Sequence, residues 1–202
     1  MKHQNSRHDR LRPLRRRGAL TGAVLLVAGG LAACGTAQTA SVASGGIVGL
    51  VSTVDGLTAE DGVIADNAPV SIFDADLPAI AKLDPGLRAA VEAAAAASEA
   101  DGVEMVVTSG WRSSGYQQSL LDDAVHEYGS YAEARRWVST PELSAHVTGD
   151  AIDIGYTDAN SWLSQHGADY GLCQTYSNEM WHFELATEPG GDCPEQKQDA
   201  NQ

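Results

Sequence analysis

Two short stretches, SAHVTGDAID and EMWH, hold the residues best suited to chemistry. They supply two imidazoles, His146 and His182, and two carboxylates, Asp153 and Glu179. A catalytic zinc ion commonly has three protein ligands drawn from His and Asp or Glu, with the fourth position left to water. The residue types therefore predict a hydrolytic metal site in which His146, Asp153 and His182 are the ligands.

Glu179 is predicted to be the general base of this site. Water bound to zinc has a pKa near 7, and a neighbouring carboxylate can accept its proton and pass it to a leaving amine. Side chains alternate along a strand, so Glu179 and His182 would face opposite ways in a regular one. Both can reach one metal only if Glu179 lies in the turn before the strand or at a bulge.

The elements around these residues are predicted from the spacing of apolar residues and from turn signals. Asp153 is expected on the opposite face of its strand from Ile152 and Ile154. The order of elements favours an α+β fold, with helices against a small, mostly antiparallel sheet. Helices are predicted at 87–100, 114–128, 131–138 and 160–166, and strands at 103–108, 151–154 and 180–185.

The first 33 residues have the features of a bacterial export signal. Seven basic side chains precede an uncharged stretch of 16 residues. That stretch is shorter than the roughly 20 apolar residues that span a bilayer, which favours a signal peptide over a short membrane anchor. It ends in Leu-Ala-Ala before Cys34, which resembles a lipobox, where the cysteine is acylated and becomes the mature N-terminus. We expect a lipid anchor on the outer face of the cell membrane; an ordinary thiol at Cys34 is the alternative.

Export would also place Cys173 and Cys193 in a compartment where disulfides persist. We predict that they pair and enclose Glu179 and His182 in the closed loop. Two free buried thiols are the alternative.

Composition and charge exclude several classes of protein. Hydrophobic residues make up 43% and charged residues 20% of the chain, which is typical of a packed soluble domain. From Cys34 onward there are six basic and 26 acidic side chains, and such a body repels a phosphate backbone. Nucleic-acid binding is therefore not expected. The predicted organisation is a signal peptide at 1–33, a tether and irregular lead-in at 34–70, the catalytic domain at 71–194 and a flexible tail at 195–202.

These motifs resemble a known family. Together with SGWRS at residues 109–113 and Gln117, the two stretches closely resemble the motifs of the VanY-type zinc D-alanyl-D-alanine carboxypeptidases. That family shares its fold with the VanX-type dipeptidases and the signalling domain of hedgehog. The resemblance spans residues 103–185 and implies a hedgehog/DD-peptidase-like fold with a bound zinc ion.

The resemblance also implies a reaction and a substrate. A zinc-bound water, assisted by Glu179, would remove the terminal D-alanine from peptidoglycan stem peptides. Arg112 would contact the substrate, since its planar fork matches either a C-terminal carboxylate or an oxyanion. Gln117 and Ser144 are candidate substrate-binding residues. No obligate protein partner is evident.

Other functions remain open at this point. The same site could serve a D-alanyl-D-alanine dipeptidase, an L,D-carboxypeptidase or a peptidoglycan endopeptidase. A non-catalytic, zinc-stabilised cell-wall binding module would not need the base Glu179. A structural-zinc adhesion protein is disfavoured, because a closed site requires four ligands and three are apparent.

Overall fold

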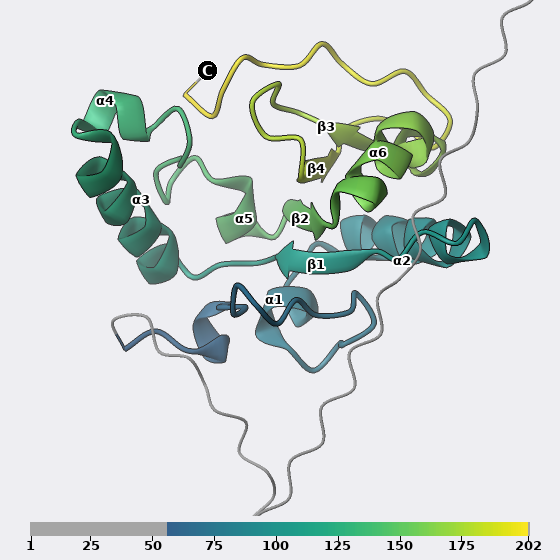
Figure 1. Ribbon diagram of the computed structural model, residues 1–202, viewed down its shortest axis with the longest axis horizontal. Coiled ribbons are helices and arrows are strands. Elements are labelled where there is room, and N and C mark those ends of the chain that lie inside the picture. The colour runs from purple at the N-terminus through teal and green to yellow at the C-terminus, as the bar shows by residue number, and fades with distance from the viewer. Residues whose placement is uncertain (1–55, 202) are drawn as a thin grey trace, which may run out of the picture. The chain divides into compact units, whose positions relative to one another are not determined.

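The computed structural model describes residues 56–201, which are built around one four-stranded sheet (Figure 1). Its strands lie in the order β1-β2-β4-β3, and each neighbouring pair is antiparallel. This confirms the predicted α+β class. The strands are β1 (Val106–Ser109), β2 (Ala151–Gly155), β3 (Leu172–Gln174) and β4 (His182–Leu185).

Two helices pack against the sheet and form the main hydrophobic core with it. The helix α2 (Pro85–Ala100) starts at Asp84, whose carboxylate accepts hydrogen bonds from the first two free N–H groups of the helix. The helix α6 (Thr157–His166) follows β2 directly. Ile152 and Ile154 of β2 are buried in this core, as the alternation of side chains predicts.

A second, smaller apolar cluster joins the helices α3 (Ser114–Tyr128) and α4 (Tyr131–Ala134), which lie at the left of Figure 1. Its buried members are Leu121, Ala124 and Ala134. The cluster is separate from the main core. Contacts outside these two apolar clusters must therefore hold the helical pair to the sheet.

Several elements are shorter than predicted or were not predicted. The helix expected at 131–138 ends at Ala134, and the strand expected at 180–185 begins at His182. One-turn helices and three-residue strands are too short to show a hydrophobic period. The unpredicted short elements are η1 (Ala59–Asp61), α1 (Pro78–Ala81), α5 (Ala145–Thr148), η2 (Gly167–Tyr170) and β3.

The C-terminal tail, predicted to be flexible, is bonded to the domain in the structure. Residues 195–201 run along the domain, and Lys197 pairs with Tyr176. Asp199 is only 7% exposed and accepts a hydrogen bond from Arg136. This ion pair and the backbone pairing hold the segment against the domain, although its polar composition alone predicts a frayed end. The structure also contains the predicted disulfide between Cys173 and Cys193.

The predicted signal peptide, Cys34 and most of the tether lie outside the described residues. Within residues 56–201, none of the helices has the length and hydropathy of a membrane-spanning segment.

Candidate metal centre

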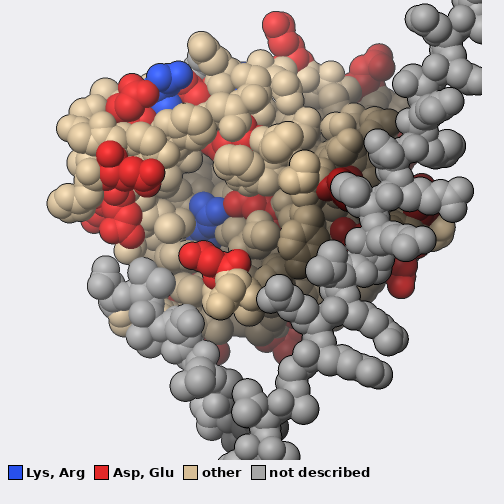
Figure 2. Space-filling model, viewed as in Figure 1, with Lys and Arg blue, Asp and Glu red and all other residues tan. Residues whose placement is uncertain are grey.

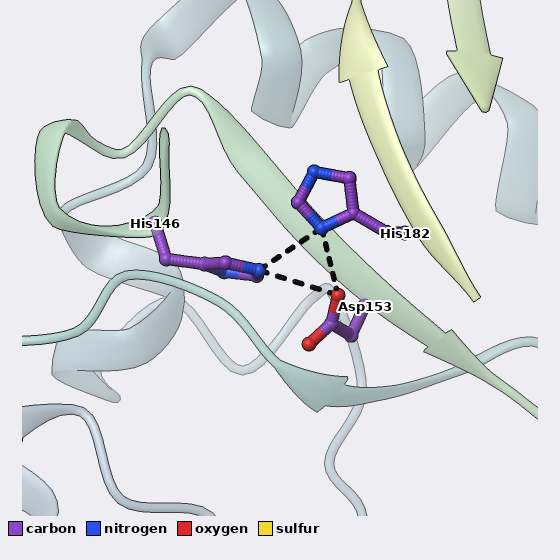
Figure 3. A group of neighbouring side chains, drawn as sticks. All are labelled: His146, Asp153 and His182. Atoms are coloured by element: carbon purple, nitrogen blue, oxygen red, sulfur yellow. Dashed lines mark hydrogen bonds and ion pairs between the residues drawn. The ribbon is translucent and has the colours of Figure 1, made fainter. Parts of the chain in front are cut away.

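Three side chains predicted to bind metal converge on one point (Figure 3). His146 Nε2 lies 3.2 Å from His182 Nδ1 and 3.3 Å from Asp153 Oδ1. His182 Nδ1 lies 3.2 Å from the same carboxylate oxygen. All three residues are buried. One nitrogen from each imidazole and one carboxylate oxygen thus face one another across a gap that a single cation can fill.

The far nitrogen of each imidazole is engaged elsewhere. His146 Nδ1 lies 2.8 Å from the carbonyl oxygen of Gly110, and His182 Nε2 lies 3.0 Å from Glu184 Oε1. In the neutral imidazole that metal binding requires, each of these far nitrogens would donate its hydrogen to the oxygen it faces. The lone pairs of His146 Nε2 and His182 Nδ1 are then free for a metal, which is the usual arrangement of ligating histidines.

Asp153 is held in the same way by Arg112. The guanidinium donates from Nη2 to Asp153 Oδ2 at 2.7 Å, from Nε to Ser109 Oγ at 2.8 Å and from Nη1 to Gln117 Oε1 at 3.1 Å. The Oδ1 atom of Asp153 therefore stays directed at the two imidazoles. Two imidazoles and one carboxylate suit zinc, so the residues present fit the predicted metal.

The sheet and one tight turn position these ligands. Asp153 of β2 is the register partner of His182 of β4, which places the two side by side. His146 lies in α5, which ends at Gly149 with a φ of 85°. A side chain at this glycine would collide with the backbone carbonyl of Lys82, and the Gly149 carbonyl accepts a hydrogen bond from the N–H of Asp84. The motif glycine thus lets the chain turn from α5 into β2.

Glu179 lies in the turn immediately before β4, so the geometric condition stated from the sequence is met. The N–H of His182 donates to the carbonyl oxygen of Glu179 at 3.2 Å. Glu179 Oε2 is 3.9 Å from His182 Nδ1. The other oxygen, Oε1, is buried without a hydrogen-bond partner, and the residue is 8% exposed. A free buried carboxylate oxygen beside a metal site is what a proton acceptor requires.

Burial and neighbouring charges shift the pKa values of these groups. Burial, reinforced by the charge of Asp153 against the attraction of His182, raises the pKa of Glu179 to about 7. Burial alone would raise the pKa of Asp153, but the two histidines and Arg112 outweigh it and hold that pKa well below its usual value. Burial lowers the pKa of His182, yet hydrogen bonds to Asp153 and Glu184 prevail and raise it to about 9.

The four residues line a cleft of about 330 Å³. Figure 2 shows several separate groups of acidic side chains on this face of the molecule and few basic ones. The opposite wall of the cleft comes from α3 and the segment after α4, and includes Leu120, Tyr128 and Trp137. A larger cavity of about 740 Å³ lies between α2 and residues 186–189, and it contains none of the predicted site residues.

The remaining predicted site residues also lie at this cleft. Ser144 and Gln117 are both buried and line it beside Arg112. Gln117 Nε2 donates to the carbonyl oxygen of Ser139, and Gln117 Oε1 accepts from Arg112, so each end of its amide is bonded to protein. Trp181, which directly precedes His182, is 39% exposed and lines the cleft.

Sequence reasoning missed two supporting groups. Glu184 binds the far nitrogen of His182, and alternation along the strand could have shown it, because residues two apart share a face. The carbonyl of Gly110, which binds His146, has no side chain and leaves no comparable signal.

Comparison with known proteins places the chain in a family. The family model of VanY, D-alanyl-D-alanine carboxypeptidase, matches residues 80–189, which is more than half of the chain. The chain belongs to the VanY family. This confirms the resemblance found in the sequence motifs.

Relatives of this VanY-family chain include a D-alanyl-D-alanine carboxypeptidase of Enterococcus faecalis. The two are 33% identical over an alignment of 112 residues, and the match covers 43% of this chain and 42% of the relative. The chain thus matches less than half the length of that curated relative.

The fold is similar to that of a solved L,D-carboxypeptidase, and a second solved structure is a weaker match. The LdcB LD-carboxypeptidase superposes with a TM-score of 0.51 at 21% identity, covering 68% of this chain and 84% of that one. A VanY mutant from a VanB-type resistance cassette, solved in complex with Zn(II), gives a TM-score of 0.48 at 28% identity and covers 50% of this chain and 71% of that one.

Proposed function

We propose that this protein is a zinc-dependent carboxypeptidase that removes the terminal D-alanine from peptidoglycan stem peptides. One observation carries the proposal: three buried donor atoms face one point beside a buried carboxylate oxygen that has no partner. Membership of the D-alanyl-D-alanine carboxypeptidase family supports the choice of substrate.

His146, Asp153 and His182 would hold the zinc ion. Zinc bound there supplies Lewis acidity, which brings the pKa of water near neutrality and polarises a carbonyl group. Within residues 56–201, only these three residues group closely enough to share an ion. A structural zinc site is closed by four ligands, whereas a set of three is typical of a catalytic site.

Glu179 moves the proton in this proposal. A general base works best when its pKa lies near the operating pH, and burial raises the pKa of Glu179 to about 7. Its unpartnered Oε1 would accept a proton from the attacking water as that water adds to the scissile carbonyl. The same oxygen would then return the proton to the amine of the departing D-alanine.

Arg112 has two roles in the proposal. Three of its five N–H groups bind Asp153, Gln117 and Ser109 and so orient the Asp153 carboxylate. Arg112 also lines the cleft, where its remaining N–H groups would contact the substrate carboxylate or the developing oxyanion. Ser144 and Gln117 would shape the cleft around the peptide.

We further propose that the protein is a lipoprotein, anchored through Cys34 on the outer face of a bacterial membrane. This location would bring the cleft to its peptidoglycan substrate. Mass spectrometry of the mature N-terminus tests the anchor, and an unmodified Cys34 in membrane-fraction protein would refute it.

The substrate proposal is tested with purified protein and synthetic stem pentapeptides ending in D-alanyl-D-alanine. We expect mass spectrometry to show the loss of one alanine, and we expect a chelator to abolish it. Release of the dipeptide, or cleavage of tetrapeptide stems alone, would reassign the bond that is cut. Cleavage that resists complete metal removal would contradict the zinc proposal.

A further inference from the structure

The C-terminal strap, residues 195–201, pairs with the segment that leads into Glu179. The N–H of Lys197 donates to the carbonyl of Thr175 at 2.9 Å, and the N–H of Ser177 donates to the carbonyl of Lys197 at 2.9 Å. The hydroxyl of Ser177 donates to the carbonyl of Gln198 at 3.1 Å. The backbone just before the proposed base is therefore bonded to the strap.

Asp199 fastens the strap to the wall of the cleft. Its carboxylate accepts a hydrogen bond from Arg136 Nε at 3.0 Å and another from the N–H of Asn201 at 3.0 Å. The backbone carbonyl of the same Arg136 accepts from Asn178 Nδ2 at 2.9 Å. Asp199, Arg136 and Asn178 thus form a chain of contacts that ends one residue before Glu179.

A second chain of contacts runs from the strap to Arg112. The hydroxyl of Ser139 donates to the carbonyl of Ala200 at 3.2 Å, and the carbonyl of Ser139 accepts from Gln117 Nε2 at 2.8 Å. Gln117 in turn accepts from Arg112, which holds Asp153. Ala200 itself lines the cleft.

Glu179 depends on such support because of where it lies. It is outside any strand or helix, its Oε1 has no hydrogen-bond partner, and its Oε2 lies 3.9 Å from His182 Nδ1, too far for a hydrogen bond to that nitrogen. Its position must then come from the backbone on either side, which β4 anchors after it and the strap anchors before it. A displacement of about 1 Å at a reacting group can cost about 100-fold in rate.

We propose that the C-terminal strap positions the active site, with Asp199 as its principal positioning residue. Acting through Arg136, Asp199 holds the turn that carries Glu179 and the wall formed by residues 137–139. The inference rests on the proposed function, because it assigns a role within the same reaction. The contacts of Asp199 thus help to set the rate of turnover.

The test compares the full-length variants Asp199→Ala and Glu195→Ala. Glu195 is an exposed acid of the same strap, so its removal is a matched loss of charge. For Asp199→Ala we expect kcat on the stem pentapeptide to fall about tenfold, with KM within about twofold and one zinc per chain retained. Glu195→Ala should match the wild type in all three.

Arg136→Ala and the double variant complete the experiment. Because the two residues act as a pair, the double variant should lose no more kcat than Asp199→Ala alone. Should Asp199→Ala fail to fold, Ser139→Ala removes a single bond to the strap, and we expect a loss of about threefold in kcat.

Three results would overturn the inference. The first is unchanged kcat in folded Asp199→Ala, or in Ser139→Ala where that variant replaces it. The second is a loss of kcat that only follows a loss of zinc or of folded protein, because that is the result of a structural role. The third is a wild-type protein that binds zinc but cleaves no stem peptide, which overturns the proposed function and the strap's role together. Wild-type cleavage with an unaffected Asp199→Ala variant overturns the strap alone.

Discussion

The two sides of the cleft are built differently. On one side, His146, Asp153 and His182 are buried next to the main core, and each has its second polar atom bound by protein. On the other side, α3 and α4 rest on a cluster of only three fully buried apolar residues. Tyr128 and Trp137 stack there with ring centroids 5.8 Å apart and remain partly exposed.

This difference separates two tasks. Ligands must be held to a fraction of an ångström, so they are placed on strands and locked by second partners. A wall with few buried apolar contacts opens more easily and can adjust to a peptide. Changes on the ligand side should therefore remove metal and turnover, and changes on the wall should mainly alter substrate affinity.

The largest effect is expected for Asp153→Asn. A neutral amide loses the charge that attracts the metal and places an N–H₂ group near the histidines or Arg112. We expect loss of bound zinc and a fall in kcat/KM of at least about 1000-fold, measured by metal analysis and peptide kinetics. Asp150→Asn, an exposed acid close by in sequence, is the control and should behave as the wild type. Full zinc content in Asp153→Asn would exclude Asp153 as a ligand.

A smaller effect on the same side is expected for Arg112→Lys. A single ammonium cannot reproduce the fork that binds Asp153, Gln117 and Ser109 together. Loss of such a supporting contact lowers metal affinity or activity by about 10- to 100-fold. Zinc competition and kcat/KM measure it, with the surface variant Arg88→Lys as control. Equal zinc affinity and equal kcat/KM in the two variants would show that the Arg112 fork does not support metal binding or activity.

The sequence predicted the ligand side better than the wall. The ligands lie in compact motifs, and the alternation of β2 predicts the opposite faces of Asp153 and its isoleucine neighbours. The bounds of α3, residues 114–128, also follow from its apolar spacing. Motifs and periodic spacings of this kind lie within a short stretch of sequence, so they can be recognised without knowledge of distant contacts.

The features that sequence reasoning missed depend on distant contacts. Arg136 and Asp199 are 63 residues apart, so the docking of the tail has no local signature. The strand β3 has three residues, and α5 is a single turn, so neither shows a period. The strand β4 begins at His182, two residues later than the strand predicted from the sequence.

The pH dependence of kcat/KM tests the assignment of Glu179 as the general base. Burial raises the pKa of Glu179 from its usual 4.5 to about 7, so the group is neutral below that range and cannot accept a proton. A bound cation lowers this pKa part of the way back, so the acidic limb of kcat/KM should lie between about pH 4.5 and pH 7. Beneath the limb, kcat/KM should fall about tenfold per pH unit. Zinc content is measured at each pH, and a flat profile between about pH 4.5 and 8 with zinc retained would refute the role of Glu179.

The smallest effect on activity is expected on the wall. Leu121→Ala leaves a cavity in the cluster of α3 and α4 and should destabilise the fold by about 2–5 kcal/mol. We expect KM to rise about threefold with zinc retained, because the wall loosens. The control is Leu163→Ala, on α6 in the main core, which should destabilise comparably and leave KM unchanged. Equal changes in KM would remove the distinction between the two sides.

The most direct test of the account is zinc content together with turnover in Glu179→Gln. This substitution keeps the shape of the side chain and removes the proton acceptor, while His146, Asp153 and His182 are untouched. We predict one zinc per chain, as in the wild type, with cleavage of the stem pentapeptide lowered by several orders of magnitude. Near-normal cleavage, or loss of zinc from this variant, would contradict the account.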